Sequence, residues 1–179
     1  MKTTFILLLG MLMLSSCKEA SDNRYTQDAP EIDLYKKSFD DYTSQNWEGL
    51  RSYYADTARL HFNTTESNPM TIDDAIADNK EMAEMLSEYG FIDGSAEFER
   101  VITDDGELWV NYWGDWYGVI AASGKRIEIP VHLTARFVDS KIVQEHGFWD
   151  TFPIYMAIME AENEEIEDVI EGEETFEEE

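Results

Sequence analysis

The second half of the chain constrains the fold most, because apolar and polar residues alternate along it from residue 91 onward. A period of two predicts β-strands that turn one face to a core. Asp-Gly at 105–106, Ser-Gly at 123–124 and Asp-Ser at 139–140 favour tight turns between these segments. The sequence therefore predicts consecutive antiparallel strands over residues 96–103, 107–120, 126–138 and 141–150.

The first half of the chain predicts helices that precede this sheet. Asp28 can cap a helix whose apolar residues recur at helical spacing, namely Ile32, Tyr35, Phe39 and Tyr42. Asn46 can cap a short helix that runs to Tyr54. Residues 58–62 form a short strand candidate.

The clearest helix signal lies between residues 70 and 90. Thr71 and Asp74 have the spacing of a capping box, and Gly90 suits the position just after the last turn. Helices followed by a meander of long antiparallel strands indicate the α+β class, with the helices packed on one face of a curved sheet.

The N-terminus has the pattern of a secretory leader. Lys2 is followed by an apolar stretch over residues 5–14, which is too short to span a bilayer. The stretch ends in Leu14-Ser15-Ser16-Cys17, and Cys17 is the only cysteine, so no internal disulfide can form. This ending resembles the lipobox of bacterial lipoproteins, which implies cleavage before Cys17 and acylation of its sulfur and its new amine. The alternative is a chance cysteine in an ordinary secretory leader.

The lipobox resemblance also implies a place in the cell. We expect residues 1–16 to be a lipoprotein signal peptide and residues 17–29 a flexible tether, anchored through Cys17 by two or more acyl chains. Lys18-Glu19 resembles the surface-export signal of Bacteroidetes lipoproteins, and the aspartate that retains enteric lipoproteins at the inner membrane is absent. The expected location is therefore the bacterial cell envelope, at the periplasmic face or the surface of the outer membrane.

Charge limits the partners that the chain can have. Asp and Glu number 39 against 13 Lys and Arg, for a net charge of −26, which argues against nucleic acid as a partner. Residues 160–179 are mostly acidic and are expected to form a largely disordered tail, with a helical continuation to about residue 172 as the alternative. Residues 30–159 are then left for one folded domain.

Several short motifs in that domain match one family. They are Asn-Trp at 46–47 with Leu50 and Tyr-Tyr-Ala-Asp at 53–56, an amphipathic helix, and a last strand ending in His-Gly-Phe-Trp-Asp at 146–150. In this order they resemble the SnoaL-like branch of the nuclear transport factor 2-like superfamily. The resemblance covers residues 32–158 and implies a cystatin-like α+β cone, a bent antiparallel sheet wrapped around helices with a pocket between them. Because this fold hosts isomerases, cyclases and non-catalytic binders, the fold alone does not decide the function.

The ketosteroid isomerase branch of the superfamily uses a carboxylate base, a tyrosine and a protonated aspartate. Aligned on the shared Ala-Asp, the base position falls on Phe62, which cannot accept a proton. The tyrosine position falls on Ser38, and the aspartate position falls near His132 or Leu133. The resemblance therefore argues against isomerase chemistry of that type.

Other branches place a catalytic aspartate on the later strands. Asp150 is the nearest candidate here, and His146, four residues earlier, has a usable pKa near neutrality. On one strand the two would face the same way about 13 Å apart, so each would act separately on a substrate. The alternative is that Gly147 marks a bulge and that His146 and Asp150 make only structural contacts.

Aromatic and histidine residues are the candidates for the pocket wall. We expect a ligand pocket lined by Tyr54, His61, Trp109, Trp113, His132 and Trp149. No histidine stands at a recognised metal-ligand spacing, so neither a metal nor another cofactor is predicted. Residues 107–120 are aromatic on both faces, which predicts helices on one face and a second copy of the chain on the other. The alternative use of the aromatic face is a stacking platform for a flat or glycan ligand.

These observations predict a lipid-anchored envelope protein whose domain binds a small apolar or amphipathic ligand, or a partner, without established catalysis. The alternative is a small-molecule isomerase, hydratase or cyclase that uses His146 and Asp150 for proton transfer. A third hypothesis is a structural module that works as a homodimer through the outer face of the sheet.

Overall fold

The structure is a computed structural model, and it describes residues 24–163. The predicted signal peptide, Cys17 and most of the tether, as well as the tail after residue 163, lie outside the described residues. Among residues 24–163, no helix combines the length and the apolar character that crossing a membrane requires. The elements are β1 (Tyr25–Thr26), α2 (Pro30–Thr43), α3 (Trp47–Ser52), β2 (Tyr54–Phe62), α4 (Ile72–Glu84), β3 (Leu86–Phe91), β4 (Glu97–Ile102), β5 (Leu108–Ile120), β6 (Arg126–Val138), β7 (Lys141–Trp149) and a terminal helix over residues 152–163.

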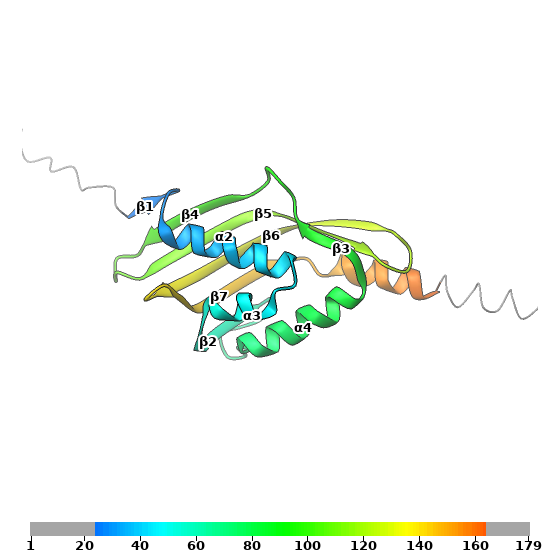
Figure 1. Ribbon diagram of the computed structural model, residues 1–179, viewed down its shortest axis with the longest axis horizontal. Helices are drawn as coiled ribbons and strands as arrows, with labels where there is room; N and C mark the ends of the chain where they lie inside the picture. Colours follow the sequence, from blue (N-terminus) through cyan, green and yellow to red (C-terminus); the bar gives the residue numbers. More distant parts are fainter. Residues whose placement is uncertain (1–23, 164–179) are drawn as a thin grey trace, which may run out of the picture.

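One seven-stranded sheet organises the domain, with the order β1-β4-β5-β6-β7-β2 and β3 paired to β5. Strands β3 and β4 share β5, because β3 pairs with residues 116–120 and β4 with residues 108–113. All pairings are antiparallel except that of β2 with β7, which is parallel. The predicted α+β class is confirmed, with the long strands curving past the helices (Figure 1).

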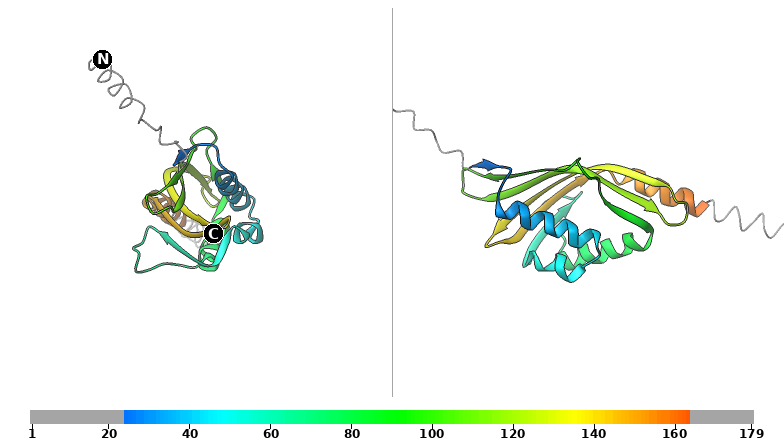
Figure 2. Two further views of the ribbon diagram at one scale, coloured as in Figure 1. Left: turned by 90° about the vertical axis from the view of Figure 1, so that its left-hand side faces the viewer. Right: turned by 45° about the horizontal axis from the view of Figure 1, so that its top comes forward.

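Helices α2, α3 and α4 all lie on one face of the sheet, while the terminal helix lies at the end opposite β1 (Figure 2). The long strands turn alternate residues toward these helices. On β5, for example, Val110, Tyr112 and Trp116 are buried, while Trp113 is 41% exposed on the outer face. We call the helix-covered face the inner face of the sheet and the other the outer face.

Local signals placed two of the helix starts. The Asn46 side chain accepts a hydrogen bond from the Gly49 N–H at the start of α3, and Thr71 and Asp74 form the predicted capping box of α4. The start of α2 lies one residue later than predicted, because Ala29 and not Asp28 is its N-cap. Proline at the first helical position, with φ already suited to a helix, fixes that start without a side-chain cap.

The helix predicted up to Gly90 is wrong in its last part. Helix α4 ends at Glu84, and Leu86–Phe91 form strand β3. Leu86 and Tyr89 continue the helical spacing of the apolar residues Ile72 and Ile76, yet they are buried from the strand instead. The physical reason is the sheet edge: residues 116–120 of β5 extend beyond β4, and β3 satisfies their backbone groups.

The terminal helix over residues 152–163 begins in residues 152–159, to which the sequence assigned no element, and reaches into the segment for which a helical continuation was the alternative. It buries its apolar residues Ile154, Ala157 and Ala161 against the domain, at helical spacing. Glu160 forms an ion pair with Lys125 in the turn between β5 and β6. Residues 160–163, at the start of the expected acidic tail, therefore continue this helix.

Candidate functional site

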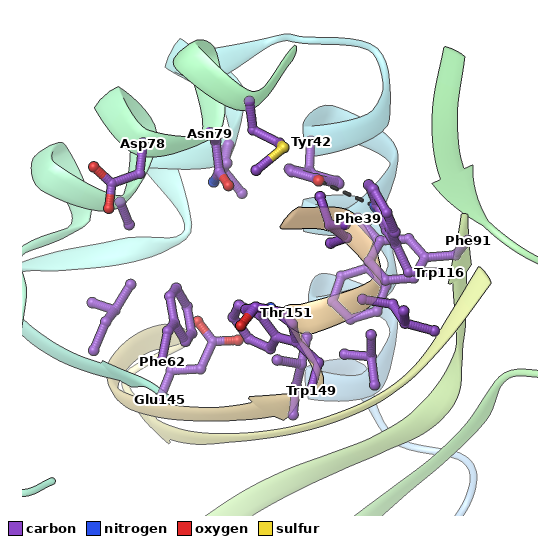
Figure 3. A pocket seen from close by; sticks show the side chains of 18 of the residues that line it. Phe39, Tyr42, Phe62, Asp78, Asn79, Phe91, Trp116, Glu145, Trp149 and Thr151 are labelled. Atoms are coloured by element: carbon purple, nitrogen blue, oxygen red, sulfur yellow. Dashed lines mark hydrogen bonds between the residues drawn. The ribbon is translucent and has the colours of Figure 1, made fainter. Parts of the chain in front are cut away.

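A cavity of about 680 Å³ lies between the inner face of the sheet and the helices. Strands β2, β6 and β7 form its floor, and α2, α4 and the terminal helix form its walls. Figure 3 shows the α4 residues Asp78 and Asn79 across the cavity from Phe62 and Glu145 on the sheet. The lining is mainly apolar and aromatic, with Phe39, Tyr42, Tyr54, Phe62, Phe91, Trp116, Trp149 and Tyr155 among its residues.

Glu145 is the one buried carboxylate on the floor of this cavity within the described part of the chain. It lies on β7, between Leu60 on β2 and Ala135 on β6. The alternation of β7 turns Glu145, Gly147 and Trp149 to the inner face. Its side chain is only 2% exposed, so its polar atoms must find partners within the protein.

Two tyrosines supply those partners. The Tyr54 hydroxyl donates to Glu145 Oε2 at 2.6 Å, and the Tyr35 hydroxyl, from α2, donates to Oε1. Burial raises the pKa of Glu145 to about 7, against the opposing effect of the two hydrogen bonds. Burial, together with the nearby Glu145 charge, also raises the pKa of Tyr35 and Tyr54 well above the usual range, so both hydroxyls remain donors. The carboxyl can therefore exchange a proton near neutral pH while its neighbours hold theirs.

Aromatic contacts shape the rest of the cavity. The rings of Phe62 and Trp149 lie 5.5 Å apart between centroids, and Gly147 lies beneath them. A Cβ at Gly147 would come within 2.5 Å of the Trp149 ring, so glycine is required for this arrangement. Trp116 Nε1 donates to the Tyr42 hydroxyl at 3.2 Å and joins β5 to α2 at one end of the cavity (Figure 3).

The residues predicted for a ligand pocket divide between the two faces of the sheet. Tyr54 and Trp149 line the inner cavity. Trp113 and His132 lie on the outer face, where their rings stack at 4.8 Å and border a second, more open hollow together with Trp149 and Asp150. The structure therefore does not bring the predicted pocket residues into one site.

The predicted proton-transfer pair is also placed outside the inner cavity. His146 faces the outer side of β7, where its ring stacks on His61 at 4.7 Å and lies 6.1 Å from the ring of Trp109. Asp150 accepts a hydrogen bond from the Phe152 N–H at 2.9 Å, at the start of the terminal helix. Asp150 therefore makes a structural contact. His146 lies on the face of β7 opposite to Glu145.

The bulge suggested at Gly147 is not there. The β6–β7 register shifts between the pairs Phe137–Ile142 and Arg136–Gln144, so Val143 is the extra residue. From residue 144 onward β7 alternates regularly, and Gly147 pairs with Leu133. A small residue at this position serves the packing of Trp149 and Phe62 rather than a break in the strand.

The positions aligned with the isomerase residues do lie at the inner cavity. Phe62, Ser38 and Leu133 all line it, whereas His132 points to the outer face. None of the three inner residues carries a carboxylate, and Glu145 supplies one from the neighbouring strand. Strand parity could have identified Glu145, because a residue four positions before Trp149 on a regular strand shares its face.

Comparison with known proteins indicates the fold that the structure shows. A family model described as a SnoaL-like domain matches residues 35–145.

Among solved structures, IdmH from Streptomyces antibioticus, described as a candidate polyketide cyclase, is 14% identical with a TM-score of 0.56, over 73% of this chain and 99% of that one. A SnoaL-like candidate polyketide cyclase from Shewanella denitrificans is 17% identical with a TM-score of 0.54, over 74% and 99%. TerC, co-crystallised with polyporic acid, is 14% identical with a TM-score of 0.57, over 73% and 99%. Among curated proteins, no sequence matches the chain. Identities this low establish a shared fold and leave the activity to be argued from the site.

Proposed function

The chain belongs to the SnoaL-like domain family, and we propose that its inner cavity binds a small, flat and mainly apolar molecule with one polar group directed at Glu145. The observation that carries the proposal is a single buried carboxyl group in a mainly apolar and aromatic cavity. Sites for small organic molecules typically combine these features, with apolar walls for affinity and a few polar groups for orientation.

The volume and the walls determine the size and shape of the ligand. A cavity of about 680 Å³ is within the usual range for drug-sized molecules. Aromatic side chains from the sheet and from α2 surround it, including Phe39 and Phe91, whose rings stack at 4.5 Å. Such walls favour a flat ring system that can make stacked or edge contacts.

Glu145 determines the polar group. When ionised, it already accepts one hydrogen bond on each oxygen and has further lone pairs for a ligand hydroxyl. When protonated, it can donate to a carbonyl group. A hydroxylated or carbonyl-bearing aromatic compound satisfies both forms, and polyporic acid is a suitable first probe because the similar fold of TerC was crystallised with it.

A thermal-shift screen tests the proposal with two variants of α4. Ala75 lines the cavity, whereas Ala77 is exposed on the same helix. We expect hydrophobic aromatic compounds to raise the melting temperature of the wild type and of Ala77→Phe, and to lose this effect in Ala75→Phe, whose ring fills the cavity. Stabilisation that is equal in the two variants, or no stabilisation of the wild type by any such compound, would refute it.

A second candidate function is proton transfer on the bound molecule, as an isomerase, hydratase or cyclase. The position of Glu145 favours it, since the carboxyl group lies on the cavity floor where a bound carbonyl compound could meet it. Solvent deuterium should then enter the α-carbon of a bound ketone, as followed by NMR. Equal rates for wild type and Glu145→Gln would leave binding as the whole function.

Lipid anchoring belongs to the same proposal. The support is the leader sequence that ends in Leu14-Ser15-Ser16-Cys17. We expect the mature protein to begin at an acylated Cys17 and to stay with the envelope membranes, at the outer membrane in the first instance. Mass spectrometry of the membrane fraction checks the acylation. A Cys17→Ala variant that remained in the membrane fraction would contradict it.

A homodimer through the outer face of the sheet completes the proposal. Trp113 and Phe148 support it, because they are 41% and 51% exposed on that face. Light scattering of the purified protein should give twice the chain mass, and Trp113→Lys should give the mass of one chain. A monomeric wild type would reject the dimer and leave ligand binding untouched.

A further inference from the structure

The outer face carries a separate cluster where the parallel strands β2 and β7 meet. His61 on β2 and His146 on β7 are register partners, and their rings stack with centroids 4.7 Å apart. Glu66, in the loop between β2 and α4, places Oε2 3.5 Å from His61 Nε2 and Oε1 3.4 Å from His146 Nε2. One nitrogen from each ring and one carboxylate oxygen all lie within 4.8 Å of one another.

The hydrogen bonding of His61 leaves one nitrogen without a partner. Its side chain is 1% exposed, and its Nδ1 lies 3.3 Å from the carbonyl oxygen of Thr65. A carbonyl can only accept, so Nδ1 carries the hydrogen and Nε2 presents a lone pair in the neutral ring. This Nε2 is buried and completes no hydrogen bond with any group in residues 24–163. A buried nitrogen of this kind is rare in folded proteins unless an ion or a water molecule satisfies it.

The Glu66 carboxylate favours a cation at this cluster. The lone pair of a neutral imidazole and a carboxylate oxygen repel each other at 3.4–3.5 Å, and here one carboxylate faces two imidazoles. Protons on the rings, or one metal ion between the three groups, would turn the repulsion into attraction. A carbonyl that holds the far nitrogen of a histidine is also the usual outer contact of a metal-binding imidazole.

We propose that His61, Glu66 and His146 bind a divalent transition-metal ion of the Zn²⁺ class. Bond lengths of about 2.0–2.2 Å in a tetrahedral site place neighbouring ligand atoms roughly 3.4 Å apart. The His61 Nε2–Glu66 Oε2 and His146 Nε2–Glu66 Oε1 distances match this separation, although each runs to a different oxygen, so the carboxylate must rotate to present one oxygen to both rings. The two stacked rings must tilt toward each other to complete the geometry. Two imidazoles and one carboxylate suit Zn²⁺ and leave a fourth position open.

Gln144 is the neighbour that must adjust. Its Nε2 lies 3.0 Å from His146 Nε2, where the amide can donate to the lone pair that the metal would use. Rotating the amide by half a turn presents its oxygen to the same region, since the two ends of a glutamine amide have nearly the same shape. The site is separate from the inner cavity, because Leu60 and Glu145 turn to the opposite face of the same two strands. An ion here would hold the loop that contains Glu66 on the outer face of the sheet.

Calorimetric titration of the full chain, purified without a histidine tag, tests the site. Excess Mg²⁺ in the buffer occupies exposed carboxylates, which prefer hard cations, so that Zn²⁺ reports on nitrogen-containing sites. We expect one Zn²⁺ per chain, and Co²⁺ at the same site should give the visible absorption of a tetrahedral complex. Glu66 is 72% exposed, so Glu66→Gln can be made without disturbing the core. Losing a ligand should weaken binding at least about tenfold, since losing even an outer contact costs about that much.

Matched variants distinguish a specific site from the acidic surface. Glu97→Gln on the outer face and His132→Gln, whose Nδ1 lies 2.9 Å from the Tyr112 carbonyl oxygen, should bind Zn²⁺ as the wild type does. His146→Gln should lose binding together with Glu66→Gln. Equal affinity of Glu66→Gln and wild type would overturn the proposal. So would weak binding of several ions that Mg²⁺ removes, which would leave protons as the only cations at the cluster.

Discussion

The substitution Glu145→Gln should change the pH dependence of stability more than any other single change in the cavity. The amide has the shape of the carboxyl group, so it can accept from one tyrosine and donate to the other without leaving a void. The substitution removes only the ability of this side chain to ionise. Because Glu145 is 2% exposed and faces the inner cavity, that titration is coupled directly to folding.

The structure gives the sign and the size of the effect. The pKa of Glu145 is about 7 in the folded protein and 4.5 as the ordinary value, so the folded state holds this proton more tightly than the unfolded state. Stability from this group is then complete below the ordinary pKa and is lost as the pH rises through the folded pKa. The difference between the two pKa values corresponds to about 3 kcal/mol of folding free energy, and this stabilisation is fully lost once the pH is well above 7.

Urea denaturation of both proteins at several pH values measures this loss. The other carboxylates titrate in both proteins and cancel in the difference between them. We expect Glu145→Gln to gain stability relative to the wild type, by up to about 3 kcal/mol, between about pH 5 and about pH 8.5. The control Glu97→Gln, an exposed carboxylate of the outer face, should track the wild type. A constant difference between Glu145→Gln and wild type across this range would refute the reasoning.

Three further substitutions test the packing around the site. Tyr54→Phe removes a hydrogen bond that lowers the pKa of Glu145, so the carboxyl resonance should titrate at higher pH in NMR; an unchanged midpoint would count against the contact. Gly147→Ala places a Cβ 2.5 Å from the Trp149 ring and should cost roughly 1–3 kcal/mol in urea denaturation, whereas a neutral result would mean that the ring moves freely. Asn46→Ala removes the cap of α3 and should cost about 1 kcal/mol by the same measurement, with no cost if water replaces the cap.

The sheet could be read from the sequence because its signals are local. The turns at 105–106, 123–124 and 139–140 have residues at positive φ, which glycine or a polar residue supplies. Between these turns the alternation fixes both the length of each strand and the face of each side chain. Strand β6 accordingly runs over the predicted residues 126–138.

Two elements escaped prediction because tertiary contacts decide them. Leu86–Phe91 continue a helical stripe, yet they pair with β5 because the end of that strand extends beyond β4. The terminal helix begins at residue 152, before the predicted acidic tail, and it is held by Ile154 and Ala157 buried in the domain. Local helix propensity and charge predict structure poorly where side chains can be buried against a neighbouring strand or in the core.

The sequence predicted some residues of the candidate site and missed others. Trp149 and Tyr54 were expected at the pocket and line it, but His146 was chosen beside Trp149 although strand parity puts the two on opposite faces. The same parity points to Glu145, although charged residues are ordinarily solvent-exposed. What no local pattern supplies is the pair of tyrosines from α2 and β2 that makes this burial tolerable.

The central claim is that a ligand occupies the inner cavity with its polar group at Glu145. The most direct measurement is a crystal structure of the protein with the aromatic compound that most raises its melting temperature. We predict electron density between α4 and the sheet, with a ligand oxygen within hydrogen-bond distance of the Glu145 carboxyl. An empty inner cavity, with the compound stacked instead on Trp113 and Phe148 of the outer face, would contradict the account.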